Sequence, residues 1–142
     1  VRPPGGCAGK VSDALVELVD VGPTLLDAAG AAALAASQGR SILSFTDAAK
    51  NSEAVGRDYS FSEIMQQTRS KEGPTFRALR DARYRMTLET TTQTPCELYD
   101  LQEDPHEAHN LLCESASSLS KYAERIEAMT QAIAKRTANH TW

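Results

Sequence analysis

The feature that most constrains this fold is a pair of short strand-like segments separated by only two residues. Residues 76–80 and 83–89 flank the dipeptide Asp81-Ala82. A two-residue connection joins neighbouring antiparallel strands, whereas parallel strands need a crossover of a dozen or more residues. The spacing therefore predicts a β-hairpin turning at Asp81-Ala82, although Asp-Ala is weaker turn chemistry than Asp-Gly.

Two further segments extend this hairpin into a sheet. Residues 59–63 alternate aromatic with polar side chains, the period of a half-buried strand, and residues 96–100 are predicted to form the last strand. The polar residues 66–75 are predicted to form a loop. Because these strands are short and close in sequence, we expect them to pair antiparallel in a sheet of about four strands.

A long amphipathic helix is predicted at the end of the chain, starting at Ser115 or Ser117. Its apolar side chains recur at steps of three or four residues, so they form one stripe. The stripe consists of Leu119, Tyr122, Ala123, Ile126, Met129 and Ile133. The sheet is the obvious surface for this stripe to pack against, and the fold class is therefore α+β.

A second, shorter helix is predicted over residues 21–29. Asp20 has the residue type of an N-cap, whose carboxylate accepts hydrogen bonds from the first turn. Pro23 falls in that first turn, where its missing N–H removes no helical bond. Gly30 can end the helix in a left-handed conformation. Residues 11–19 before it fit either a short strand or the approach to the helix.

Composition excludes several classes of protein. The 142 residues suffice for one compact domain or a large piece of a bigger one, and the net charge is −4 with both signs interspersed. Without a basic block, and with only 6% aromatic residues, nucleic acid is not an expected partner. No apolar run approaches the roughly 20 residues of a membrane span. The first residues lack both an initiator Met and a signal peptide, so we expect the chain to begin within a longer protein.

An acidic stretch after residue 100 admits two interpretations. Asp104 can cap a short helical turn, Pro105 fits its first position, and Glu107 can reach back to the cap amide, with Asn110 ending the turn in a left-handed conformation. Carboxylates and histidines could instead bind a metal or supply general bases. The residues of this alternative are Asp100, Glu103, Asp104, His106, Glu107 and His109. Capping accounts for the pattern without a ligand, so we favour the structural interpretation.

The remaining candidates for chemistry are weaker. Four hairpin arginines could bind an anion, but edge-protecting surface charges are the simpler explanation. Those arginines are Arg77, Arg80, Arg83 and Arg85. The cysteines Cys7, Cys96 and Cys113 form no C-x-x-C pair, so a disulfide framework or zinc site is not expected. His140 and a glycosylation sequon at 139–141 lie at the chain end. From the residues alone we assign no catalytic, metal or cofactor-binding residue.

Four segments occur in the order found in one enzyme family. They are Arg2-Pro3-Pro4-Gly5 with Gly9-Lys10; residues 11–30, which include Val19-Asp20-Val21-Gly22-Pro23-Thr24-Leu25-Leu26; Gly39-Arg40-Ser41-Ile42-Leu43; and Leu98-Tyr99-Asp100-Leu101 followed by Asp104-Pro105, Glu107 and Asn110-Leu111. The last resembles an LYDL-x-x-DP-x-E-x-x-NL signature. Through these segments the chain resembles the C-terminal part of a sulfatase, within the alkaline phosphatase superfamily.

The resemblance implies a specific chemistry in the intact enzyme. Sulfatases hydrolyse sulfate esters or sulfamates with a formylglycine made from Cys or Ser in a C/S-x-P-S-R motif, and with a divalent cation, usually Ca²⁺. None of the three cysteines here is followed by Pro-Ser-Arg. Therefore no catalytic or metal residue is transferred to this chain, and both groups are expected upstream of it.

The resemblance also implies an organisation and partners. Residues 1–57 would be the end of the main α/β domain, and residues 58–142 a C-terminal subdomain of sheet and helix that flanks the active-site cleft, with the loop 66–75 near substrate. The expected partners are the remainder of the catalytic domain and a sulfated small molecule or glycan. The alternatives are a fragment of a phosphonate or phosphate monoester hydrolase, a free-standing interaction domain, and a metal sensor using Asp104, His106 and His109. The sequence assigns neither compartment nor oligomeric state.

Overall fold

The computed structural model describes residues 11–45, 56–65, 75–113 and 120–138. The chain divides into two compact units, residues 1–58 and residues 59–142, each described by itself below. Several predicted features lie outside the described residues. They are Cys7, most of the loop 66–75, the start of the last helix with Leu119, the sequon at 139–141 and His140.

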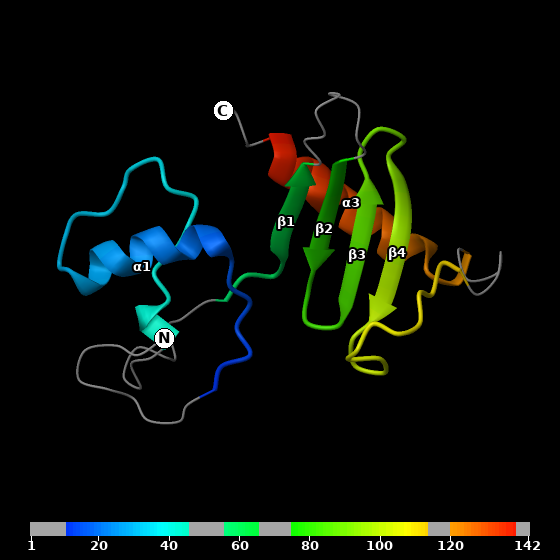
Figure 1. The fold of residues 1–142 in the computed structure, drawn as a ribbon, viewed down its shortest axis with the longest axis horizontal. Helices are drawn as coiled ribbons and strands as arrows, with labels where there is room; N and C mark the ends of the chain where they lie inside the picture. The colour runs from blue at the N-terminus through cyan, green and yellow to red at the C-terminus, as the bar shows by residue number, and fades with distance from the viewer. Residues whose placement is uncertain (1–10, 46–55, 66–74, 114–119, 139–142) are drawn as a thin grey trace. The chain divides into compact units, whose positions relative to one another are not determined.

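The second unit is built on a four-stranded antiparallel sheet, which confirms the predicted α+β class. The strands β1 (Ser60–Met65), β2 (Thr75–Arg80), β3 (Tyr84–Glu89) and β4 (Thr94–Asp100) lie in sequence order across the sheet (Figure 1). Each strand pairs with its neighbour in the chain. The sheet is therefore a simple meander in which every connection joins adjacent strands.

The turn of the predicted hairpin is displaced by one residue. Asp81 pairs with Tyr84 through a backbone bond of 2.9 Å, so the two turn residues are Ala82 and Arg83 rather than Asp81 and Ala82. The Asp81 carboxylate accepts hydrogen bonds of 2.7 Å from the amides of Arg83 and Tyr84. Aspartate favours the first position of a turn because its carboxylate can accept hydrogen bonds from these amides. With Asp81 in the first position, the two central turn residues lie one residue later than predicted.

The β3–β4 connection is held by another carboxylate. Glu89 accepts hydrogen bonds from the amides of Thr91 and Thr92 at 2.7 and 2.8 Å, and from the Thr92 hydroxyl. Gln93 completes the connection with a left-handed φ of 55°. The hydrogen bond from the Thr92 hydroxyl and the two amides lower the pKa of Glu89 to about 2.

This low pKa gives a titration that can be measured. Following the Glu89 carboxyl by NMR is expected to give a pKa of about 2, below its ordinary value of 4.5. Because the folded-state pKa is depressed, the stabilisation is complete above the ordinary value and is lost as pH falls toward 2. Thr92→Val should raise the pKa, whereas Thr91→Val, which keeps the donating amide, should change it less. A pKa near 4.5 in the unmodified protein would contradict the assigned contacts.

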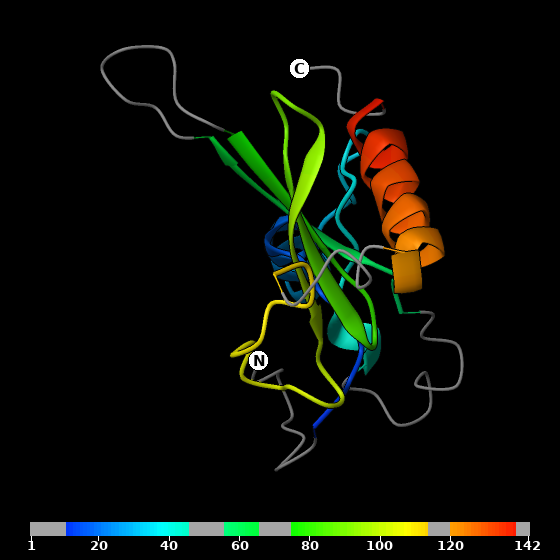
Figure 2. The ribbon, with the colours of Figure 1, turned by 90° about the vertical axis from the view of Figure 1, so that its right-hand side faces the viewer.

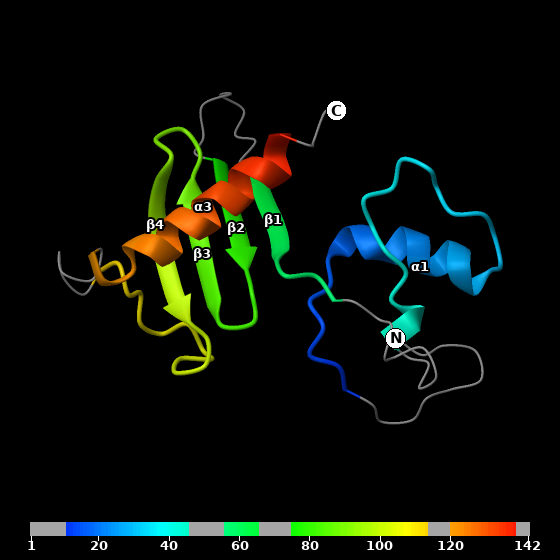
Figure 3. The ribbon, with the colours of Figure 1, turned by 180° about the vertical axis from the view of Figure 1, so that it is seen from behind.

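One face of the sheet is covered by the helix α3 (Ala123–Ala138), which crosses the strands obliquely (Figure 3) and lies on one side of the sheet when it is viewed edge-on (Figure 2). Met129 and Ile133 of the predicted stripe are buried, and Tyr122 and Ile126 pack beside them, whereas Ala123 is exposed. The buried strand residues that complete the core are Leu79, Met86, Leu88 and Leu98.

Polar contacts join α3 to the sheet at the β2–β3 turn. Arg125 of α3 forms an ion pair with the buried Asp81. Its guanidinium also lies 5.1 Å from the centre of the Tyr84 ring, and that of Arg83 lies at the same distance. The contacts of Arg125 with Asp81 and Tyr84 hold the start of the helix over the turn.

The first unit contains the helix α1 (Val21–Ala28), preceded by the 3₁₀ turn η1 (Leu18–Asp20) and followed later by the 3₁₀ turn η2 (Leu43–Phe45). Gly30 has a φ of 66°, which confirms its predicted role at the helix end. Residues 11–17 form no strand, so the alternative of an approach to the helix is correct. Within the described residues, no helix has the length and apolar character needed to cross a bilayer.

Candidate functional site

The acidic stretch after β4 forms a loop and not the predicted capped helical turn. The Asp104 carboxylate accepts hydrogen bonds from the amides of Ala108 and His109 at 3.1 and 2.8 Å, so Asp104 does cap backbone amides. Glu107, however, does not reach back to the cap, and it is Glu107 and not Asn110 that has a left-handed φ, of 56°. The predicted capping box and the role given to Asn110 are therefore wrong.

Asn110 instead covers the outer edge of β4. Its Oδ1 accepts hydrogen bonds of 3.1 Å from the amides of Leu98 and Leu112, and its Nδ2 donates to the Cys96 carbonyl at 2.9 Å. The Leu111 amide donates to the Leu98 carbonyl at 2.9 Å. Because β4 ends the sheet, these bonds satisfy backbone groups that no neighbouring strand reaches.

Replacing Asn110 by alanine should therefore destabilise the second unit. We expect a loss of about 1–3 kcal/mol in the free energy of unfolding, because the amide of Leu98 and the carbonyl of Cys96 lose their partner together. Urea denaturation followed by far-UV circular dichroism would measure this. Gln102→Ala, at an exposed side chain of the same loop, is the control and should stay within about 0.5 kcal/mol. Equal midpoints for both variants would refute the role of Asn110.

Glu107 lies instead in a charged network. Its carboxylate receives a 2.7 Å hydrogen bond from Arg85, whose guanidinium also lies 3.8 Å from Glu97 and 5.7 Å from the centre of the Tyr99 ring. Glu97 accepts a 2.6 Å hydrogen bond from the Thr87 hydroxyl. A left-handed backbone is strained for a residue other than glycine. In this conformation the Glu107 carboxylate accepts the hydrogen bond from Arg85.

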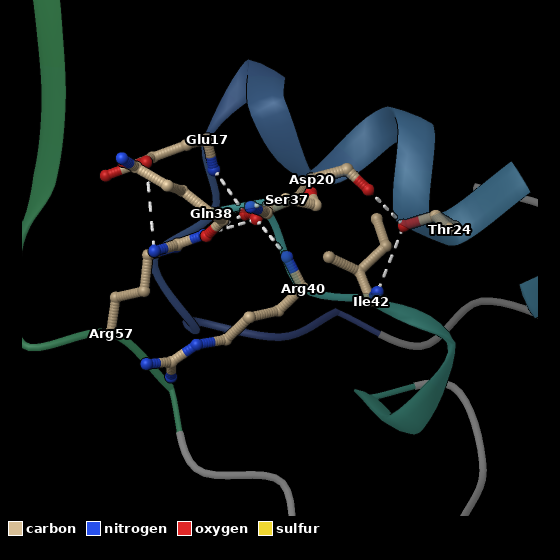
Figure 4. Close-up of polar contacts among 9 residues, drawn as sticks. Glu17, Asp20, Thr24, Ser37, Gln38, Arg40, Ile42 and Arg57 are labelled. Atoms are coloured by element: carbon tan, nitrogen blue, oxygen red, sulfur yellow. Dashed lines mark hydrogen bonds and ion pairs between the residues drawn. The ribbon is translucent and has the colours of Figure 1, made fainter. Parts of the chain in front are cut away.

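In the first unit, the carboxylate of Asp20 joins three segments that are distant in sequence (Figure 4). It accepts hydrogen bonds of 2.8 Å from the amides of Glu17 and Arg40, and it forms a two-pronged ion pair with Arg57. Arg57 also donates to the Gln38 carbonyl at 3.3 Å. Asp20 occupies the predicted N-cap position of α1, but its side chain makes no bond to the first turn, so the predicted capping by its carboxylate is wrong.

The segment Gly39–Leu43 fits against this carboxylate and α1. A side chain at Gly39 would lie 2.0 Å from the Val19 carbonyl oxygen, so only glycine allows this approach. The Ser41 hydroxyl donates to Asp27, and the Ile42 amide donates to the Thr24 hydroxyl at 3.1 Å. We call Glu17, Asp20, Thr24, Arg40, Ile42 and Arg57 the Asp20 cluster.

The charge of Asp20 is maintained by its partners. Burial raises the pKa of this carboxyl, but the hydrogen bonds from Arg57 and from the amides of Glu17 and Arg40 outweigh burial and hold the pKa below its usual range. The residue is only 2% exposed. Its contacts are saturated by this chain, which is the arrangement of a structural ion pair and not of a group available to a substrate.

The hairpin arginines are not brought together as an anion site. Arg77 donates to Glu63 at 2.7 Å, and Arg83 forms a bidentate pair with Asp100 at 2.7–3.1 Å. Arg85 is engaged by Glu107, as described above, whereas Arg80 is exposed. Three of the four guanidinium groups thus have carboxylate partners, which favours the explanation as paired surface charges.

The sheet face opposite α3 contains a shallow hollow of about 260 Å³. It combines apolar side chains of β1 and β2 with polar side chains of β3 and β4. The lining residues are Ser62, Ile64, Phe76, Ala78, Arg85, Thr87, Cys96 and Glu97, and we call this surface the open face. Sequence reasoning missed it, although the alternation of residues on each strand could have indicated which side chains share this face.

The candidate ligands predicted from the acidic stretch do not converge. Among the described residues, no three His, Cys, Asp or Glu side chains gather in a way that could hold a metal ion. His106 and His109 are both exposed. Cys96 and Cys113 are free thiols, and burial raises the pKa of the Cys96 thiol. The described residues thus form the Asp20 cluster, the charged network of Arg85, Glu97 and Glu107, and the open face.

Comparison with solved structures shows where similar architecture occurs. A 2-O GAG sulfatase, BT1596, superposes with a TM-score of 0.71 at 27% identity over 91% of this chain and 27% of its own. A putative sulfatase from Bacteroides thetaiotaomicron VPI-5482 gives 0.64 at 27% identity over 84% of this chain and 25% of its own. The phosphonate monoester hydrolase SpPMH from Silicibacter pomeroyi gives 0.69 at 28% identity over 98% of this chain and 28% of its own.

The chain thus spans only about a quarter of the length of these relatives. No curated protein sequence matches it. The family model described as N-sulphoglucosamine sulphohydrolase, C-terminal, matches residues 1–138, which include the Asp20 cluster and the whole sheet. By this match the chain belongs to the family of C-terminal regions of N-sulphoglucosamine sulphohydrolase, as the resemblance to sulfatases predicted.

Proposed function

We propose that this chain is the C-terminal part of a hydrolase that cleaves sulfuric esters or sulfamates, and that its own role is structural. In this proposal residues 1–57 complete the main α/β domain, and residues 58–142 form a subdomain beside the active-site cleft. The sulfated substrate would be a small molecule or a glycan. The observation that carries the proposal is the family match over residues 1–138.

The character of the matching segments supports a structural role. The run from Asp20 to Ile42 and the run from Leu98 to Leu111 both hold backbone segments together through carboxylate and amide side chains. The side chains of Asp20 and Asn110 at the centre of these contacts are bonded to groups of this chain. Neither run presents a nucleophile paired with a base, which a reaction centre would need.

We propose that the catalytic groups lie in the part of the intact protein that precedes this region. A formylglycine from a C/S-x-P-S-R motif would supply the nucleophile, and a Ca²⁺ ion would stabilise the charge on the sulfate oxygens. The described residues offer no cluster of ligands that fits such an ion. No step of the reaction is therefore assigned to a side chain of this chain.

A phosphonate monoester hydrolase is the second candidate. SpPMH matches 98% of this chain at 28% identity, values comparable with those of the sulfatases. The two reactions differ in the group that is transferred, and the residues that select that group would lie outside this chain. The proposal of a sulfatase is favoured because the matching family description names a sulphohydrolase.

One experiment separates these activities. The coding sequence upstream of Val1 is read for a C/S-x-P-S-R motif, and the extended protein is then assayed with an aryl sulfate, a sulfated glucosamine and an aryl phosphonate monoester. We expect sulfate release that is abolished when the Cys or Ser of that motif is replaced by Ala. Hydrolysis of the phosphonate alone would favour the second candidate, and an upstream sequence without the motif would overturn the sulfatase proposal.

A further inference from the structure

We draw no further inference here: the strongest candidate, the apolar groove that Pro95 of β4 forms with Ala123, Ile126, Glu127, Thr130 and Gln131 of helix α3, carries nothing because nothing in the structure shows what covers it.

Discussion

Replacing Asp20 by alanine is expected to destabilise the first unit by about 3 kcal/mol. Removing one partner of a buried ion pair usually costs about 3–5 kcal/mol, since the remaining charge is left without its counter-ion. The lower end applies here because Glu17 also lies 3.8 Å from Arg57 and partly compensates its charge. The amides of Glu17 and Arg40 lose an acceptor in the same step.

Amide hydrogen exchange at Arg40 would measure the loss directly, because this amide is released when the Asp20 cluster opens. Asp13→Ala is the matched control, since Asp13 is exposed and should change the exchange free energy by less than about 0.5 kcal/mol. Arg57→Lys keeps the charge but loses the two-pronged contact, so an intermediate effect is expected. Similar exchange in the Asp20 and Asp13 variants would show that the cluster does not hold this unit together.

The same cluster gives a pH dependence of known sign. The pKa of Asp20 is held below its usual value of 3.8 in the folded state. A depressed carboxyl pKa stabilises the fold above the unfolded-state value, and the stabilisation is lost as pH falls below 3.8 toward the folded value. The Asp20 cluster should therefore open more often in acid, and the free energy of opening measured at the Arg40 amide should fall. The Asp20→Ala variant should not show this fall.

Replacing Leu98 by alanine is expected to lower the free energy of unfolding of the second unit by about 2–5 kcal/mol. Leu98 is completely buried and belongs to the same core as Met86, Met129 and Ile133. Truncation would leave a cavity inside this core cluster. Against a typical total stability of about 5–15 kcal/mol, this is a large fraction.

Urea denaturation followed by circular dichroism would measure the effect of the Leu98 change. Leu98→Met is the volume-conserving control and should cost less than about 1.5 kcal/mol. Ile64→Ala removes a similar apolar side chain from an exposed site, so it should change the stability of this 142-residue chain by less than about 0.5 kcal/mol. If Leu98→Ala and Ile64→Ala have equal midpoints, the assignment of the core is wrong.

The elements that could be predicted from sequence are those set by local pattern. The stripe containing Met129 and Ile133 predicted which face of α3 is buried, because a helix repeats its faces every 3.6 residues. Gly30 ends α1 because glycine adopts a left-handed backbone without strain. The antiparallel order of the sheet followed from short connections.

The predictions that were wrong concern polar side chains with distant partners. Asp20 was expected to cap the helix next to it, but its partners Arg40 and Arg57 lie 20 and 37 residues away in sequence. Glu107 was expected to bond to its own turn, but Arg85 lies 22 residues before it. Local capping rules count only neighbouring donors, so they assign a carboxylate to the nearest amides when tertiary contacts offer stronger ones.

The edge of β4 has a consequence for how the molecule behaves among its own copies. A strand from another molecule could extend the sheet there only by bonding to Leu98 and Cys96, whose outward groups are already bonded to Asn110 and Leu111. Extension would first require this loop to detach. Sheet polymerisation at this side of the protein is thus blocked by the Asn110 carboxamide and the Leu111 amide, which take the place of a neighbouring strand.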